Sequence, residues 1–287
     1  MIAVVTAKAA RGLDDDEVFL SAALDHAGIG YRAEAWDDPE ALWDQYELVV
    51  VRSPWDYAAR RAEFLEWSRH VAAVTTIVNP PEVLRWSTDK HYLLDLAARG
   101  VPTVPTIYIA VGETIAIDRG DVVVKPAVGA GSADCGRHRD RADAEAHARA
   151  LLEQGRAVLI QPYVSAVDDH GETALVYFDG RFSHAIRKGP ILAAPIELVG
   201  GLFAREDISP RDASDVERAV AEMALGAVPF AEPLLYARVD LVPGRDGPLV
   251  LEVELCEPSL FFGHDTGAAE RFVEALTGRL GRTQALR

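Results

Sequence analysis

Four charged side chains that alternate with apolar ones make the stretch Leu235–Leu255 (LYARVDLVPGRDGPLVLEVEL) the part of the sequence best suited to chemistry. Apolar residues recur at every second position on each side of a Pro/Gly/Asp turn, which predicts two β-strands joined as a hairpin. Because strand side chains alternate between faces, the charged residues must share the face opposite the apolar ones. These charged residues are Arg238, Asp240, Glu252 and Glu254.

The pairing of the two strands decides how close these charges come. If Val242 lies opposite Val250, the facing pairs are Asp240 with Glu252 and Arg238 with Glu254. Neighbouring carboxylates repel one another unless a cation lies between them, and oxygen ligands of this kind hold Mg²⁺, commonly together with phosphate oxygens. A solvated sheet face with one cross-strand ion pair explains the same residues, and the hairpin alone does not decide between the two.

A second candidate site is the strand DVVVKP, which ends on Lys125 and runs into the loop AVGAGSADCG. Glycines let backbone N–H groups approach an anion, and a lysine supplies a positive charge, so this segment suits a phosphate group. The pattern is neither the phosphate loop of P-loop enzymes nor the GxGxxG dinucleotide motif. A flexible surface loop after an edge strand is the alternative.

Three further basic residues are weaker candidates. Arg52 ends the strand LVVVR and begins RSPWDY, where open α/β sheets place ligands, and Asp56 lies in the same segment. Lys90 falls in the first turn of a helix that Ser87 or Thr88 is expected to cap and that runs to Arg99. Arg187 follows the second strand of a hairpin predicted around residues 179–180.

The elements that must position these residues begin with a small α/β unit. Buried strands are predicted at residues 2–6, 31–36 and 48–52, and amphipathic helices at 15–27 and 61–73. This rhythm of strand, helix and strand predicts a parallel sheet with helices on its faces. Asn79-Pro80-Pro81 breaks the pattern.

The rest of the chain is predicted to be of mixed α and β structure. Helices are expected at 143–154, 212–227 and 268–280, and a strand at 157–164. Residues 191–210 carry no clean pattern and are expected to form a long functional loop or a mobile segment.

Composition narrows the class of protein. A net charge of −16 over 287 residues argues against a nucleic-acid backbone as partner. Cys135 and Cys256 fit no metal-ligand spacing and are expected to be free thiols. With no apolar stretch long enough to span a membrane and too short an N-terminal apolar run for a signal peptide, we expect a cytoplasmic protein without a membrane partner.

Taken in order, these segments closely resemble the ATP-grasp superfamily, which includes D-alanine–D-alanine ligase, glutathione synthetase and the ribosomal-protein glutamate ligases. The resemblance runs from about residue 80 to 262 and rests on the Lys90 helix before GVPTVPT, the Lys125 strand and glycine-rich loop, a strand containing Gln161, and RVD with LEVE. It implies an α/β (α+β) ATP-grasp fold, in which a small N-terminal parallel α/β domain precedes two α+β subdomains that clasp a nucleotide. The implied boundaries are 1–86, 87–162 and 163–287.

The resemblance also implies roles for individual residues. Catalytic roles fall to Lys125, Arg187 and Arg238, and one or two Mg²⁺ ions to Asp240, Glu252 and Glu254; the family often has asparagine in place of Glu254. ATP contacts are implied for Lys90 and Lys125 at the phosphates, for Gln161, Pro162, Tyr163 and Val164 at the adenine, and for Asp168 or Asp169 at the ribose hydroxyls. Substrate contacts are implied for Arg52, Asp56, Arg187 and Ser259.

Within the superfamily, RSPWDY and LEVELCEPSLFF resemble a bacterial group that includes the O-ureido-D-serine cyclo-ligase of D-cycloserine biosynthesis. The implied activity is ATP-dependent activation of a carboxylate of an amino-acid-like small molecule as an acyl phosphate, which a nitrogen then attacks, within the same molecule in the cyclo-ligase. A two-substrate ligase of the glutathione-synthetase type, a phosphotransferase, and a nucleotide-binding regulator without activity remain alternatives. The family often forms homodimers.

Overall fold

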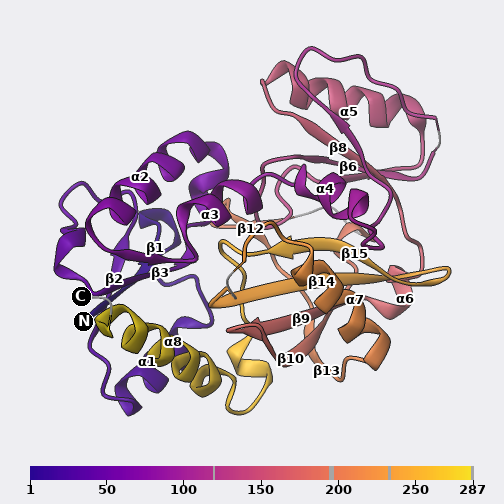
Figure 1. Cartoon of the computed structure of the whole chain (residues 1–287). Coiled ribbons are helices and arrows are strands. Elements are labelled where there is room, and N and C mark those ends of the chain that lie inside the picture. The colour runs from indigo at the N-terminus through magenta and orange to yellow at the C-terminus, as the bar shows by residue number, and fades with distance from the viewer. Residues whose placement is uncertain (119, 194–196, 232–233, 286–287) are drawn as a thin grey trace.

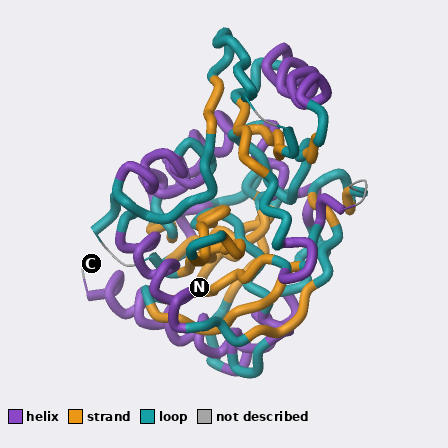
Figure 2. Tube along the Cα trace, turned by 90° about the vertical axis from the view of Figure 1, so that its right-hand side faces the viewer, coloured by secondary structure: helices purple, strands orange, loops and turns teal. Residues whose placement is uncertain are grey.

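Three β-sheets of four or five strands and one two-stranded sheet organise the chain in the computed structural model, which describes residues 1–118, 120–193, 197–231 and 234–285. The N-terminal sheet lies at one end of the molecule, and a five-stranded sheet forms the centre (Figure 1). A smaller four-stranded sheet with one helix stands apart from the rest, most clearly in the rotated view (Figure 2). The expected ATP-grasp architecture has this division, although the three predicted domain boundaries stay a prediction.

The N-terminal sheet is parallel, as predicted, with strand order β2-β1-β3-β4. Its strands are β1 (Ile2–Thr6), β2 (Tyr31–Ala35), β3 (Leu48–Ser53) and β4 (Thr76–Val78). Its helices are α1 (Glu17–His26), α2 (Arg61–Val74) and α3 (Pro81–Ser87).

Alternation along β1 and β3 explains why this sheet is covered on both faces. Ile2, Leu48 and Val50 share a buried cluster with α1 and with the C-terminal helix α8 (Ala268–Ala285). Ala3, Val5, Val49 and Val51 share a second cluster, with the aromatic residues of α2. Helix α8 therefore packs on α1 of the first domain, although it is the last helix of the chain (Figure 1).

The small sheet carries one phosphate-type lysine of the sequence prediction. It has the antiparallel order β5-β8-β6-β7, with strands β5 (Ile107–Ile109), β6 (Val122–Pro126), β7 (Gly136–His138) and β8 (Val158–Pro162). Helix α5 (Arg141–Glu153) begins at Asp140, whose carboxylate accepts hydrogen bonds from two backbone N–H groups of its first turn.

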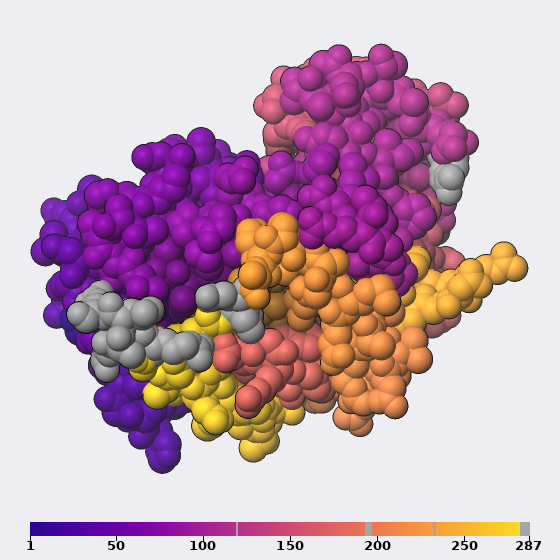
Figure 3. All heavy atoms as spheres, viewed as in Figure 1, coloured from indigo at the N-terminus to yellow at the C-terminus, as the bar shows by residue number. Residues whose placement is uncertain are grey.

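The central sheet is also antiparallel, in the order β13-β10-β9-β14-β15. Its strands are β9 (Glu172–Phe178), β10 (Arg181–Lys188), β13 (Ile208–Arg211), β14 (Tyr236–Gly244) and β15 (Gly247–Glu254). Its short helix α6 (Val167–His170) is followed later by α7 (Asp215–Gly226), which opens with a capping box between Ser214 and Glu217. The tip of the β14–β15 hairpin projects from the surface (Figure 3).

The hairpin register confirms both predicted charge pairs but corrects the reason for them. Asp240 faces Glu252 and Arg238 faces Glu254. Val242, however, faces Leu249 rather than Val250, because the register shifts between Asp240 and Leu241. A bulge of one residue shifts the pairing of all residues between it and the turn. The predicted pairs are therefore correct for the charged residues, which lie before the bulge, and wrong for the residues next to the turn.

Two other predicted elements are wrong. The helix expected from Ser87 or Thr88 to Arg99 is two helices, α3 and α4 (Tyr92–Ala98), with Lys90 in the turn between them. The Thr88 hydroxyl donates to the Leu84 carbonyl of α3 and so ends that helix instead of capping the next. The segment 191–210 contains β11 (Leu198–Val199), β12 (Phe203–Ala204) and the start of β13; its residues 194–196 lie outside the described part.

No helix in the described ranges is long and apolar enough to cross a membrane.

Asn79 joins the N-terminal domain to the central sheet. Its buried amide donates to the carbonyl oxygens of Tyr236 (3.0 Å) and Leu255 (2.8 Å) and accepts from the Leu235 N–H (2.9 Å). The amide therefore satisfies one backbone donor and two acceptors at the base of the β14–β15 hairpin, which fixes the hairpin against the first domain.

We expect Asn79→Ala to lower the free energy of unfolding by about 3 kcal/mol, because buried backbone groups lose their partners. Urea denaturation measures the loss. Glu82→Gln, an exposed change three residues away in α3, should cost less than about 0.5 kcal/mol. Equal stability of the two variants would contradict the assigned role of Asn79.

Candidate active site

The candidate pocket lies between the small sheet and the central sheet, with Trp55 of the N-terminal domain in its lining. It is lined by the α3–α4 turn, the end of β6, the glycine-rich loop, the end of β8 and the charged face of β14 and β15. Eleven of the predicted site residues line it: Lys90, Lys125, Gln161, Pro162, Tyr163, Val164, Arg238, Asp240, Glu252, Glu254 and Ser259.

Arg238 and Asp240 form a buried ion pair on β14. The Arg238 guanidinium donates to both carboxylate oxygens of Asp240, at 2.8 and 3.0 Å, and also to Glu254 and to the carbonyl oxygen of Ser259. Although burial alone raises the pKa of the Asp240 carboxyl, Arg238 and Lys188 lower it to about 2. Asp240 is therefore ionised and fully engaged with basic side chains.

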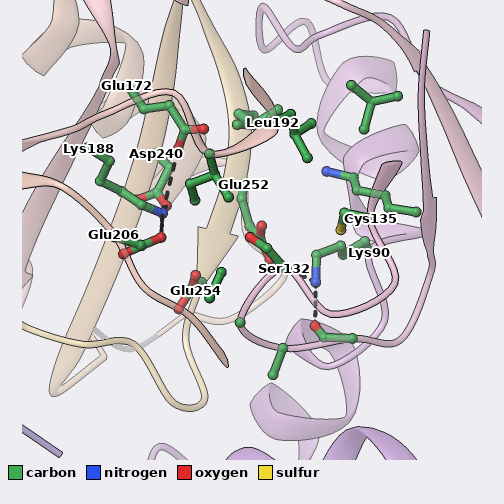
Figure 4. Close-up of a pocket in the computed structure, with 18 of the residues that line it drawn as sticks. Lys90, Ser132, Cys135, Glu172, Lys188, Leu192, Glu206, Asp240, Glu252 and Glu254 are labelled. Atoms are coloured by element: carbon green, nitrogen blue, oxygen red, sulfur yellow. Dashed lines mark hydrogen bonds and ion pairs between the residues drawn. The ribbon is translucent and has the colours of Figure 1, made fainter. Parts of the chain in front are cut away.

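Lys188 is the functional residue that the sequence prediction missed. Its ammonium lies 3.2 Å from Asp240, 3.0 Å from Glu206 and 3.5 Å from Glu172, and these acids surround it in the pocket (Figure 4). Burial raises the pKa of the Glu172 carboxyl to about 7, although Lys188 opposes the shift. The sequence did carry one signal for Lys188, because lysine is rare in this chain. There are only four lysines, and the structure places three of them in the pocket lining.

Arg187, predicted to be catalytic and to bind substrate, does not line the pocket. It donates to the carbonyl oxygen of His170 at 3.0 Å and lies 3.7 Å from Asp207. Alternation along β10 puts Arg187 and Lys188 on opposite faces, so the strand presents Lys188 to the site. The prediction chose the wrong one of two neighbouring cations.

Lys90 and Glu252 form the second ion pair of the pocket. The Lys90 ammonium lies 2.9 Å from the Glu252 carboxylate and donates to the Gly129 carbonyl oxygen at 2.6 Å. Burial disfavours the charged lysine, but Glu252 outweighs it and raises the Lys90 pKa. Burial likewise opposes ionisation of Glu252, yet Lys90 and Lys125 lower the pKa of its carboxyl. The glycine-rich loop is thereby tied to β15.

Lys125 is different from the other pocket cations. The residue is 7% exposed, and within the described ranges no carboxylate lies close enough to form an ion pair with it. Burial lowers its pKa, and Glu252 compensates only in part. A buried ammonium without a counter-ion is stabilised by any anion that enters the pocket.

The carboxylates of β14 and β15 fit Mg²⁺ only in part. Within the residues described, no three acidic, histidine or cysteine side chains lie in a group that could hold a metal ion. Both oxygens of Asp240 are taken by Arg238, whereas Glu252 and Glu254 keep side chains 23% and 21% exposed toward the pocket. Burial raises the pKa of the Glu254 carboxyl to about 8 despite Arg238. A divalent cation would replace the proton on Glu254, so Glu252 and Glu254 are the better pair of ligands.

The predicted adenine segment at the end of β8 also lines the pocket. Gln161 is buried and donates to the Thr106 hydroxyl at 2.9 Å, and the Tyr163 N–H donates to the Asp121 carbonyl oxygen at 2.8 Å. Asp168 and Asp169 do not line the pocket; Asp168 accepts from the Tyr163 hydroxyl. Their predicted ribose contacts are therefore not supported by the positions of their carboxylates.

Arg52 and Asp56 are not at the pocket either. Arg52 is 1% exposed and donates to Asp16 (3.2 Å) and to the Pro258 carbonyl oxygen (3.0 Å), and Asp56 accepts from the Trp36 indole. The predicted substrate contacts are wrong because Arg52 is buried against Asp16 and Pro258, and because the half-buried Asp56 is engaged by Trp36 and Arg60 away from the pocket. From this segment only Trp55 reaches the pocket.

The glycine-rich loop and β12 contact each other. The Ala204 N–H donates to the Gly131 carbonyl oxygen at 2.8 Å, and the Phe203 ring lies 4.9 Å from that of Trp55. Gly131 has φ of +58°, and a Cβ there would lie 2.4 Å from the Cβ of Phe203. The glycine-rich loop can approach β12 only because residue 131 lacks a side chain.

We expect Gly131→Ala to weaken ATP binding by about tenfold or more, since the loop must move away from β12. Isothermal titration with ATP measures the effect. Gly155→Ala is the matched control: Gly155 also has positive φ, +76°, but a Cβ there meets nothing within 4 Å. If both variants bind ATP equally well, the contact between loop and β12 is unimportant for the nucleotide.

Comparison with known proteins agrees with this architecture. The model of the N-terminal domain of D-cycloserine synthetase DcsG matches residues 2–79. The cycloserine biosynthesis protein DcsG of Streptomyces lavendulae is 42% identical, over 98% of this chain and 99% of its own. The crystal structure of D-cycloserine synthetase DcsG has a TM-score of 0.87 at 40% identity, covering 97% of this chain and 99% of that one.

More distant structures share the fold alone. D-alanine–D-alanine ligase from Bacillus anthracis complexed with ATP has a TM-score of 0.70 at 14% identity, covering 99% of this chain and 98% of that one. The ATP-grasp RimK domain protein from Sphaerobacter thermophilus has a TM-score of 0.67 at 19% identity, covering 97% and 100%. The predicted ATP-grasp fold is confirmed, and the chain belongs to the DcsG family of ATP-grasp ligases.

Proposed function

We propose that this ligase uses ATP to close the ring of O-ureidoserine, giving cycloserine. Its relationship to DcsG over nearly the whole chain supports this substrate class. The observation within the pocket that carries the use of a nucleotide is Lys125, a buried ammonium without an ion-pair partner among the described residues. A triphosphate supplies the missing negative charge, and the neighbouring loop supplies backbone N–H groups.

The pocket lining contains apolar and basic residues that suit the two parts of ATP. An adenine ring would be sandwiched between apolar side chains of the small and central sheets, among Gln161–Val164, Val104, Val242 and Leu251. Lys90, Lys125, Lys188 and Arg238 supply positive charge for the phosphates. In this arrangement the phosphates lie over the charged face of the β14–β15 hairpin.

Mg²⁺ would be held by Glu252 and Glu254, where it would neutralise phosphate charge and polarise the bond that breaks. Phosphate oxygens near Lys90 would take over the interaction that Glu252 now makes with that lysine. Glu252 is then free to bind the cation.

Two groups of one substrate react in turn, first its carboxylate and then a nitrogen of its side chain. A substrate carboxylate oxygen attacks the γ-phosphorus, ADP leaves, and an acyl phosphate forms. The nitrogen bonded to the side-chain oxygen then attacks the acyl carbon, the phosphate leaves, and that nitrogen loses its proton. The carbamoyl group on the nitrogen takes up one water and leaves as carbon dioxide and ammonia. Arg238 and Lys188 lie where they can stabilise the transferring phosphoryl group.

The contact between the glycine-rich loop and β12 supports the proposal, because an acyl phosphate must be kept from water. Trp55 and Phe203 close that side with apolar rings.

An ADP-release screen over D- and L-amino acids, including both enantiomers of O-ureidoserine, tests the proposal. We expect ADP, phosphate and ammonia in equal amounts with O-ureidoserine, and a product with the mass of cycloserine. A linear amide formed from two substrates would indicate a two-substrate ligase, and a phosphorylated product a phosphotransferase. If no compound causes ADP release, the remaining alternative is a nucleotide-binding regulator without catalytic activity.

A further inference from the structure

Pairing of charges in the pocket leaves one carboxylate over. Within the described part of the chain, five of the six acids that line the pocket have a basic side chain within 4.0 Å: Asp240, Glu254, Glu252, Glu172 and Glu206. The sixth, Glu257, has none in the ranges described. Lys125 is the corresponding cation without a carboxylate partner, and the proposed triphosphate accounts for it. Among the described residues, no basic side chain forms an ion pair with Glu257, so a cationic ligand can take that place.

Glu257 lies at the end of the pocket next to the N-terminal domain. The Trp55 indole donates to its carbonyl oxygen at 3.1 Å, and Trp55 itself lines the pocket. The backbone of Glu257 is therefore fixed by the domain that precedes the nucleotide-binding sheets. Glu254, Ser259 and Arg238 line the same side, so Glu257 borders the region where the acyl phosphate would form.

The surroundings of Glu257 disfavour an unpaired negative charge. Burial raises the pKa of its carboxyl, while hydrogen bonding by Tyr57 and Cys256 and the charge of Lys90 lower it in part. Glu252 adds repulsion. A cationic ligand placed here would be favoured twice, because it neutralises Glu257 and because its charge can face the aromatic ring of Trp55.

We propose that Glu257 binds the protonated amine of the amino-acid substrate, with Trp55 as the apolar wall beside it. This inference rests on the proposed function, since it assigns one group of that substrate to one side chain. It explains why a partly buried carboxylate of the pocket forms no ion pair with any basic side chain that the structure describes. It also predicts that the enzyme discriminates against substrates that lack the amine.

The test compares Glu257→Gln with wild type on two compounds. For O-ureidoserine, we expect KM to rise at least about 30-fold, with less than a threefold change in ATP affinity. The second compound, 3-(ureidooxy)propanoic acid, lacks the amine, and as an inhibitor it should bind wild type and Glu257→Gln equally. Glu257→Asp keeps the charge and should recover part of the lost affinity. Glu66→Gln, at an exposed ion pair on α2, is the control for charge alone.

Three outcomes overturn the assignment while wild type still releases ADP with O-ureidoserine. The first is a KM of Glu257→Gln for O-ureidoserine that stays within threefold of the wild-type value. The second is a loss of affinity by the same factor for both compounds. The third is a loss of ATP affinity that accompanies the loss of substrate affinity. A protein that gives no ADP with O-ureidoserine instead overturns the proposed function. Thermal unfolding of Glu257→Gln shows whether the variant is folded, and Glu257→Asp decides the question if it is not.

Discussion

Replacing Lys125 by methionine is expected to weaken ATP binding at least about 100-fold while leaving the folded protein as stable as wild type or more so. The ammonium is buried at the end of β6 and has no carboxylate partner in the described ranges. Methionine has a similar length and no charge, so it can occupy the same space. Loss of function and loss of stability should therefore separate at this position.

The sign of the stability effect follows from the pKa of Lys125. Burial lowers that pKa below its unfolded value, so the folded state disfavours the charged form. The resulting penalty is fully present below the folded pKa and disappears as pH rises toward the unfolded value of 10.5. At neutral pH the substitution removes the penalty. The gain should shrink in alkaline solution.

Isothermal titration with ATP and urea denaturation at pH 7 measure the two effects. The matched control is Lys8→Met, because Lys8 is the one lysine of the sequence that does not line the pocket, and its side chain is 49% exposed. Lys8→Met should leave ATP affinity unchanged. A Lys125→Met protein that binds ATP normally would show that the unpaired ammonium has another purpose.

Local sequence pattern predicted the charged hairpin because strand alternation needs no knowledge of the rest of the chain. It placed Asp240 opposite Glu252 correctly, yet it could not show the bulge after Asp240, since an extra residue leaves no signature in a run of apolar side chains. The same limit applies at β10. Two adjacent cations, Arg187 and Lys188, are equally plausible until the register shows which faces the pocket.

The prediction that Arg52 contacts substrate was wrong for a different reason. The rule that ligands bind at the carboxyl ends of parallel strands locates a region of the fold. In that region the Arg52 guanidinium donates to Asp16 and to the Pro258 carbonyl oxygen, so it is not available to a substrate. The Asp16 carboxylate also accepts from the N–H groups of Leu260, Phe261 and Phe262. These contacts join residues more than 200 positions apart, so no local pattern contains them. The polar end of β3 thus serves to fix the loop after β15.

Glu252→Gln is expected to reduce ADP formation at least about 100-fold and to lower the free energy of unfolding by about 1–3 kcal/mol. Glu252 faces the pocket from β15 and neutralises Lys90 at 2.9 Å. Glutamine keeps the shape and can still accept a hydrogen bond from that ammonium, but it carries no charge for Lys90 or for Mg²⁺. The protein should stay folded, with the buried cation poorly compensated.

The pH dependence of stability distinguishes this pair from a solvated one. The Glu252 pKa is lowered from 4.5, so its contribution is present above pH 4.5 and is lost as pH falls through the folded value. The Lys90 pKa is raised from 10.5, so its contribution is present below that pH and is lost above it. Wild type should therefore exceed Glu252→Gln in stability by a constant amount between these limits, and the difference should vanish in acid.

A double-mutant cycle with Lys90→Met separates the ion pair from the metal site. In stability, the two changes should be strongly non-additive, because removing Lys90 also removes the unpaired charge that Glu252→Gln leaves behind. In ADP formation, Lys90→Met should not rescue Glu252→Gln, because the missing ligand for Mg²⁺ is still missing. Rescue of activity by the second substitution would show that Glu252 serves only to neutralise Lys90, and the charged face of the hairpin would then hold phosphate without a metal ligand at this position.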